Sequence, residues 1–265
     1  MEINEEILWS VKRDAIRALI EAGKRSDNRE WNQFRAIELA PDFVRKAEGS
    51  CFIKLGNTQV LVGVKFAVGV PYPDTPESGT LMTSAELVPI ASPIFRAGPP
   101  DEDSIELARV VDRGIRESKM IDFDALCITP KEEVWSVMVD LHVLDHDGNL
   151  LDAASIAAVR ALLDARFPKY EDKKVIYTEK TKKKLPLKDV PVSSTFAKVG
   201  SALLLDPLLE EEKAMDARVT IATTHEGNIC AIQKGGSGSF TLEECEKLAS
   251  EAIKAGKEIR KQHLK

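Results

Sequence analysis

The sequence contains few cysteines, and their spacing fits neither a metal site nor a redox pair. Cys51, Cys127, Cys230 and Cys245 lie far apart in the chain. This pattern argues against a disulfide scaffold or a cysteine-based zinc site. We therefore expect the cysteines to be small core residues, and the protein to belong to a reducing compartment, the cytoplasm.

Long apolar runs are absent as well. A membrane-spanning helix needs a run of about 18 apolar residues or more, and the chain has none. The N-terminus, MEINEEILWSVKRDAIRALI, begins with acidic residues and continues as an amphipathic helix, which is unlike a secretory signal. The sequence therefore indicates no membrane partner.

Basic residues do not outnumber acidic ones. The chain has 37 Lys and Arg against 43 Asp and Glu, a net charge of −6. A protein that coats nucleic acid with its whole surface needs the opposite balance, so any polyanion site must be a local basic patch. The 265 residues are 43% hydrophobic, which is enough to bury a sizeable core.

Two β-rich halves follow one another, each closed by helices. In the first half, strands are expected on both sides of a hairpin turn at Asn57, and a small-residue helix is expected from about Leu151 to Phe167. The charged segment 168–189 reads as a connection that contains an exposed ribbon. This pattern predicts an α+β protein with domains at residues 1–189 and 190–265.

The second half restarts with strands, an acidic patch LLEEEKAMDA and two further strands. The glycine loop QKGGSGSFTLEE then leads into a long final helix. Thr241 and Glu244 have the spacing of a capping box, so this helix start needs no bound anion. The lysine run KTKKK at residues 180–184 is typical of a solubilising surface, although it would suit a polyanion if it faced one.

The segment PPDEDSIELARVVDRGIRESK predicts a helix that begins near Ser104, with Asp103 and Glu106 as its capping pair. At about 100° per residue, the apolar side chains gather on one side of this helix. They are Ile105, Ala108, Val111 and Ile115.

Three arginines of the same helix, Arg109, Arg113 and Arg116, fall within an arc of about 60° on another side. The row could hold a polyanion. It could equally be a solvated face, because Glu106 and Asp112 flank it and can form pairs along the helix.

The stretch DLHVLDHDGN is rich in metal-ligand residue types. His142 and His146 are four residues apart in an expected strand, which separates them by about 13 Å, too far to ligate one ion. A strand that ends in an Asp-Gly turn is the simpler interpretation.

Three stretches together resemble the RNase PH family of phosphate-dependent 3′ to 5′ exoribonucleases, and within it the non-catalytic RNase PH-like subunit of the archaeal exosome. They are GKRSDNREWNQFRAIEL, AEGSCFIKLGNTQVLVGVK and ELARVVDRGIR. The similarity continues through VDLHVLDHDGNLLDAASIAAVRALL to NICAIQKGGSGSFT, nearly the whole chain. The resemblance implies the RNase PH fold, two stacked βα halves with mixed sheets and packed helices.

The departures from the active pattern bear on catalysis. Active members place two arginines directly before SIE, where this chain has Glu102 and Asp103. Active members also carry two acids six residues apart, and the matching positions here are Glu212 and Arg218. Phosphorolysis needs cations to hold phosphate and acids to assist the leaving oxygen, usually with a divalent ion. The resemblance therefore implies no catalytic residues, no metal and no cofactor in this chain.

The resemblance also assigns a role to the arginine row. Arg109 and Arg113 match positions at which the family subunit is expected to contact RNA phosphates, and Arg116 lies on the same arc. The implied partners are a catalytic RNase PH-like sister subunit, in a hexameric ring of three heterodimers, RNA-binding cap subunits and single-stranded RNA. In such a ring the chain would support the sister's active site at their interface.

Two other hypotheses stay open at this point. One is an autonomous phosphate-dependent exoribonuclease with Asp206, Glu211, Glu212 and Asp216 as its candidate acids. The other is a structural spacer that makes no contact with RNA.

Overall fold

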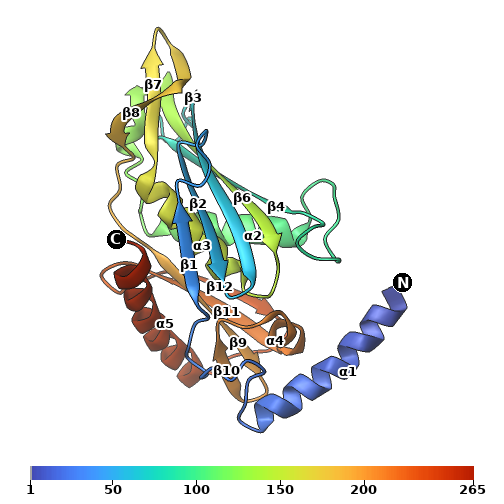
Figure 1. Cartoon of the computed structure of the whole chain (residues 1–265). Helices are drawn as coiled ribbons and strands as arrows, with labels where there is room; N and C mark the ends of the chain where they lie inside the picture. Colours follow the sequence, from blue (N-terminus) through green and yellow to red (C-terminus); the bar gives the residue numbers. More distant parts are fainter. Residues whose placement is uncertain (1) are drawn as a thin grey trace.

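The computed structural model describes the backbone of residues 2–265 and the side chains of residues 12–178 and 180–265. Its sheets and helices stack in layers (Figure 1). In chain order the elements are α1 (Glu2–Glu21), β1 (Ile37–Pro41), β2 (Gly49–Leu55), β3 (Thr58–Gly69), β4 (Thr80–Leu87), α2 (Glu102–Glu117), β5 (Cys127–Thr129), β6 (Glu133–Asp145), α3 (Leu150–Asp164), β7 (Arg166–Glu171), β8 (Lys174–Lys184), β9 (Val192–Val199), β10 (Ala202–Leu205), α4 (Leu209–Ala214), β11 (Ala217–Thr223), β12 (Ile229–Gly236) and α5 (Leu242–His263).

The first sheet has the strand order β1-β2-β3-β6-β4, with β5 paired to the edge of β6. β4 runs parallel to β6, and the other neighbours are antiparallel. Alternate residues of β3 are buried because successive side chains of a strand point to opposite faces. The hairpin predicted at Asn57 is confirmed, since β2 and β3 pair directly across it.

The second sheet is antiparallel throughout, in the order β10-β9-β11-β12. α5 packs on β9 and β11 and so covers one face of this sheet. The predicted capping box is confirmed: Thr241 Oγ1 accepts from the N–H of Glu244, whose carboxylate accepts from the N–H of Thr241. A separate two-stranded ribbon, β7 with β8, extends from the end of the first sheet and confirms the ribbon expected in the connection (Figure 1).

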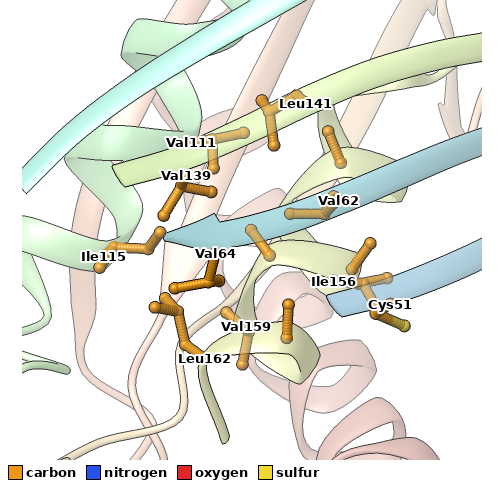
Figure 2. Close-up of a cluster of buried hydrophobic side chains, with 14 of the residues drawn as sticks. Cys51, Val62, Val64, Val111, Ile115, Val139, Leu141, Ile156, Val159 and Leu162 are labelled. Atoms are coloured by element: carbon orange, nitrogen blue, oxygen red, sulfur yellow. The ribbon is translucent and has the colours of Figure 1, made fainter. Parts of the chain in front are cut away.

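Helices α2 and α3 lie between the two sheets and contact both of them. α3 is apolar on nearly all sides, which is expected for a helix in the middle layer. The core around it is drawn in Figure 2, where Ile156, Val159 and Leu162 face strand β3, which carries Val62 and Val64. Gly49 on β2 allows this close packing, because a Cβ there would lie 2.3 Å from the carbonyl oxygen of Ala161.

Two expectations are wrong, and one helix was not predicted. α3 ends at Asp164, because the chain turns at Ala165 into the ribbon strand β7, so Phe167 is a buried strand residue. The helix that was not predicted is α4, in the acidic patch. Only one of the cysteines, Cys51, is a buried core residue, whereas Cys245 is exposed on α5.

The N-terminal helix is present as predicted, over Glu2–Glu21, and projects from the body in Figure 1. Its C-terminal part contacts α4. Arg17 makes this contact by donating to the carbonyl oxygen of Ala214 and to both carboxylate oxygens of Asp216.

Candidate functional site

Helix α2 begins two residues earlier than the sequence suggested. Asp101, not Asp103, is the N-cap residue, and its carboxylate accepts from the N–H of Ser104 at 2.9 Å. The expected pairing of Asp103 with Glu106 at the cap is therefore wrong. Three consecutive acids could each cap this helix, and Pro100 suits the position just outside it, which leaves Asp101 as the cap.

The apolar face of α2 is also shifted from the predicted one. Val111 and Ile115 are buried as expected, and Leu107 and Val110 join them. Ile105, expected in the core, is 48% exposed. The helix is wedged between β4 and β12, so a broad arc is covered from both sides while the first turn stays open.

The three arginines of the predicted row differ in what they contact. Within the described part of the chain, Arg109 is exposed and makes no ion pair or hydrogen bond through its side chain. Arg113 is exposed and donates only a long 3.5 Å hydrogen bond to Gln233 on β12. Arg116 pairs with Asp112 at 2.9 Å and donates to the carbonyl oxygen of Leu81 at 3.2 Å.

The row therefore contains two available guanidinium groups, Arg109 and Arg113, one helical turn apart and about 6 Å from each other along the axis. Arg116 forms the i,i+4 pair that the solvated-face interpretation expected, and it secures α2 to β4.

A pocket of about 170 Å³ opens beside the first turns of α2, between the two halves of the chain. It brings together residues that the resemblance to active members singled out. Asp103 and Arg218, which were expected to depart from the active pattern, and Glu212, which keeps the acid, all line the pocket, whereas Glu102 does not. Its other polar residues are Glu106, His146 and Lys213.

An ion pair closes one side of this pocket. Arg218 on β11 donates to the carboxylate of Glu106 on α2, across the boundary between the halves. Gly235, the neighbour of Arg218 on β12, makes room for it, because a Cβ at 235 would lie 2.7 Å from Arg218 Nε. The cation at position 218 is thus neutralised by the protein itself.

Glu212 is the one acid of the second half that faces the pocket. Its carboxylate accepts from the N–H of Asn149 at 2.9 Å. Burial raises the pKa of Glu212 to about 7, against the opposing effects of that hydrogen bond and of nearby Arg218. His146 lies in the same pocket, stacked on Phe95, and burial lowers its pKa to about 4. Burial therefore favours the neutral forms of these two side chains.

The other candidate acids of the nuclease hypothesis are bound to arginines of the N-terminal segment. Glu211 forms a buried pair with Arg25 at 2.6 Å. Asp206 is fully buried and accepts from Arg29 and Arg35. Asp216 pairs with Arg17. These three acids hold the N-terminal segment to the second half, so they are not available to a substrate.

No metal centre forms at the histidine-rich strand. Among the described residues, no group of three His, Cys, Asp or Glu side chains lies close enough to hold an ion. His142 instead contacts Glu86, 3.2 Å away, on the neighbouring strand.

Two family models match this chain. The first domain of the 3′ exoribonuclease family spans residues 33–168, and the second domain spans residues 189–255. The chain belongs to the 3′ exoribonuclease family. This assignment confirms the resemblance to RNase PH proteins and the α+β fold predicted from the sequence.

The family includes curated proteins with close similarity to this chain. An exosome complex component Rrp42 of Pyrococcus furiosus is 50% identical over 266 residues, covering 97% of this chain and 94% of that protein. One of Methanopyrus kandleri is also 50% identical and covers 97% of each chain.

Solved structures of archaeal exosomes also contain chains similar to this one. A chain of the Archaeoglobus fulgidus exosome with RNA bound to the active site superposes with a TM-score of 0.91 and 45% identity, covering 97% of this chain and 99% of that one. A chain of an archaeal exosome core superposes with a TM-score of 0.88 and 42% identity, covering 99% of this chain and 100% of that one. Rice Rrp46, at 18% identity and a TM-score of 0.67 over 91% of this chain, shares the fold.

The sequence reasoning missed the arginines that precede the first sheet. The stretch GKRSDNREWNQFR reads locally as a polar turn, yet Arg25, Arg29 and Arg35 are the partners of Glu211 and Asp206. The available signal was an arginine at short, repeated intervals in a segment with few apolar residues. Such a run needs acids elsewhere in the chain if any of its members is buried.

Proposed function

We propose that this chain is a non-catalytic subunit of an archaeal exosome, in which it pairs with a catalytic family member and supports that partner's active site. The observation that carries the proposal is the ion pair of Arg218 with Glu106, in the pocket that also holds Asp103. Three acids, Asp103, Glu106 and Glu212, outnumber Lys213, the one cation of the lining that makes no ion pair within the described part of the chain, so the pocket offers inorganic phosphate little positive charge. Phosphorolysis depends on such a charge.

The arrangement of the acids supports the same proposal against the autonomous nuclease. Asp206 and Glu211 are buried against arginines, and Asp216 pairs with Arg17. Of these four candidate acids, only Glu212 lines the pocket, and burial raises its pKa to about 7. Burial thus opposes the charged form, in which a carboxylate binds a divalent ion.

The RNA contact of this chain is proposed for the row on α2. Arg109 and Arg113 are exposed, and their spacing suits successive phosphates of one strand. Arg116 extends the row but also pairs with Asp112, so its contribution is expected to be smaller. Such contacts with the phosphate backbone do not depend on base sequence.

The proposed assembly is a hexameric ring of three heterodimers with RNA-binding cap subunits. The similarity to chains of solved archaeal exosomes supports it. We also propose the domain division at residues 1–189 and 190–265, which assigns the ribbon β7–β8 to the first domain. Within the part of the chain that the structure describes, no helix is both long and apolar enough to cross a membrane. A cytoplasmic location stays a prediction.

The decisive experiment is a phosphorolysis assay on the purified chain alone and on its complex with the catalytic family member of the same organism. Both receive single-stranded RNA, inorganic phosphate and magnesium, and release of nucleoside diphosphates is measured. We expect release only from the complex. If the chain alone releases them and Glu212→Gln abolishes that release, the chain is an enzyme and the proposal is wrong.

A further inference from the structure

A second basic surface lies away from α2, at the root of the ribbon. A groove of about 410 Å³ runs between the loop after β1, the end of α3 and strand β8. Its lining includes four basic residues, two of which come from β8 within the lysine run KTKKK. The basic residues are Arg45, Arg166, Lys180 and Lys182.

Two of the three acids that line the groove are paired with cations that do not line it. Glu48 has no exposed side-chain surface and pairs with Lys65 at 2.8 Å. Asp164 pairs with Arg160, one turn earlier on α3, at 2.8 Å. Neither Lys65 nor Arg160 lines the groove. Asp42 is the remaining acid among the lining residues, so the four cations face one unpaired carboxylate.

Three of the four cations are free to meet a ligand. Arg45, Arg166 and Lys182 are exposed, and none of their side chains makes an ion pair or hydrogen bond with the part of the chain that the structure describes. Lys180 donates to the carbonyl oxygen of Ala47, which fixes its position without neutralising its charge.

The ribbon brings these charges together along the groove. Lys180 and Lys182 line the groove from β8, where the register of β8 with β7 is irregular. Arg166, which lies opposite Lys184 in that register, lines the groove from β7. A protein of net charge −6 thereby concentrates positive charge along one short groove.

An exposed aromatic residue belongs to the loop that lines one side of the groove. Phe43 lies between the lining residues Asp42 and Val44, is 56% exposed, and is held in place by stacking on Phe52 with ring centroids 5.2 Å apart. Sites for single-stranded nucleic acid combine a cationic groove that follows the backbone with an aromatic ring on which a base can stack.

We infer that this groove binds single-stranded RNA through its phosphates, as a second contact separate from the row on α2. The choice of RNA over an acidic protein segment rests on the proposed function, on the unpaired cations of the groove and on the exposed side chain of Phe43 in the same loop as Arg45. Arg45, Arg166 and Lys182 hold the phosphates, and Phe43 stacks on a base.

The test compares the full chain with the variant Arg45→Ala/Arg166→Ala/Lys182→Ala. The control variant Lys254→Ala/Lys257→Ala/Lys261→Ala removes the same charge from the exposed face of α5. Binding of a labelled oligouridylate is measured by fluorescence anisotropy over a salt series. The groove variant should lose about 2 units of the slope of log affinity against log salt, at about 0.7 for each lost phosphate contact. The control should retain the parent slope.

Ultraviolet cross-linking of the same RNA separates this inference from the proposed function. Cross-links to the peptide around Phe43 should persist in Arg109→Ala/Arg113→Ala and disappear in the groove variant. An unchanged salt slope in the groove variant, or no RNA binding by the parent chain at low salt, would overturn the inference. Polyglutamate serves as a probe for an acidic protein segment. The inference would also be overturned if the groove variant lost binding of polyglutamate but kept binding of RNA, or if it failed to assemble with the catalytic subunit. Either result would make the groove a protein interface.

Discussion

Arg218 and Glu106 are 112 residues apart in the sequence and form an ion pair between the second sheet and helix α2. The helix carries Arg109 and Arg113 on the turns that follow Glu106. The pair therefore ties the orientation of the proposed RNA contact to the second half of the chain.

Replacing Arg218 by Ala should destabilise the chain by about 1 kcal/mol, as for a partly exposed ion pair. Arg218→Glu should cost more, because a third carboxylate would then face Glu106 and Glu212. The double reversal Glu106→Arg/Arg218→Glu should recover part of the loss. Urea unfolding of the parent, Arg218→Glu, Glu106→Arg and the double variant tests this double-mutant cycle. Complete additivity of the two single changes would contradict the ion pair.

Replacing both Arg109 and Arg113 by Ala should weaken RNA binding by the assembled complex for all sequences alike. The slope of log affinity against log salt should fall by about 1.4 in total, or about 0.7 for each contact. The melting temperature should hardly change, because both side chains are exposed.

Arg116→Ala is the matched control on the same helix. Because Arg116 pairs with Asp112 and the carbonyl oxygen of Leu81, its loss should lower stability more than RNA affinity. If Arg116→Ala weakens RNA binding as much as the double variant does, the division of the row into available and engaged arginines is wrong.

Asp206→Ala should strongly destabilise the chain, by about 3–5 kcal/mol, because it leaves the buried guanidinium of Arg35 without its partner. Asp216→Ala removes a more exposed pair with Arg17 and should cost no more than about 1 kcal/mol. Thermal denaturation compares the two variants. A small effect of Asp206→Ala would show that this acid is not a structural anchor.

Glu212→Gln should become more stabilising, relative to the parent, as the pH rises from about 4.5 to about 7. The folded-state pKa of Glu212 is raised from 4.5 to about 7. Below this window the carboxyl group is protonated in both the folded and the unfolded state. Within it the unfolded state loses the proton first, so the parent loses stability as the pH rises.

Each unit of that pKa difference corresponds to about 1.4 kcal/mol. Glutamine keeps an oxygen for the N–H of Asn149 and carries no charge at any pH. Urea unfolding at a series of pH values gives the difference between variant and parent, which cancels the titration of other groups. A difference that is constant with pH would mean that the pKa of Glu212 is not raised.

The features predicted correctly from the sequence are those that depend on near neighbours. The turn at Asn57 separates two β-rich runs directly, and Thr241 caps its helix through Glu244, three residues away. The cap of α2 was misplaced by two residues because Asp101, Glu102 and Asp103 all have suitable side chains. Only the path of the chain after Pro100 decides among them.

The site itself could be predicted only in part. Family resemblance identified Asp103 and Arg218 as departures and Glu212 as a retained acid, but their meeting in one pocket depends on how the halves stack. The arginine partners of Asp206 and Glu211 lie more than 170 residues away, so no local pattern could reveal them. The groove beside the ribbon was hidden for the same reason, since it combines residues from three separate segments.

Gly235 constrains the order in which the residues at positions 218 and 235 can change. With glycine there, position 218 can hold either a short acid or the long arginine, because nothing occupies the space above the neighbouring strand. Once position 235 acquires a side chain, its Cβ would lie 2.7 Å from Arg218 Nε, so the arginine must move or be replaced. An evolutionary path to or from the paired arginine therefore passes through sequences that keep this glycine.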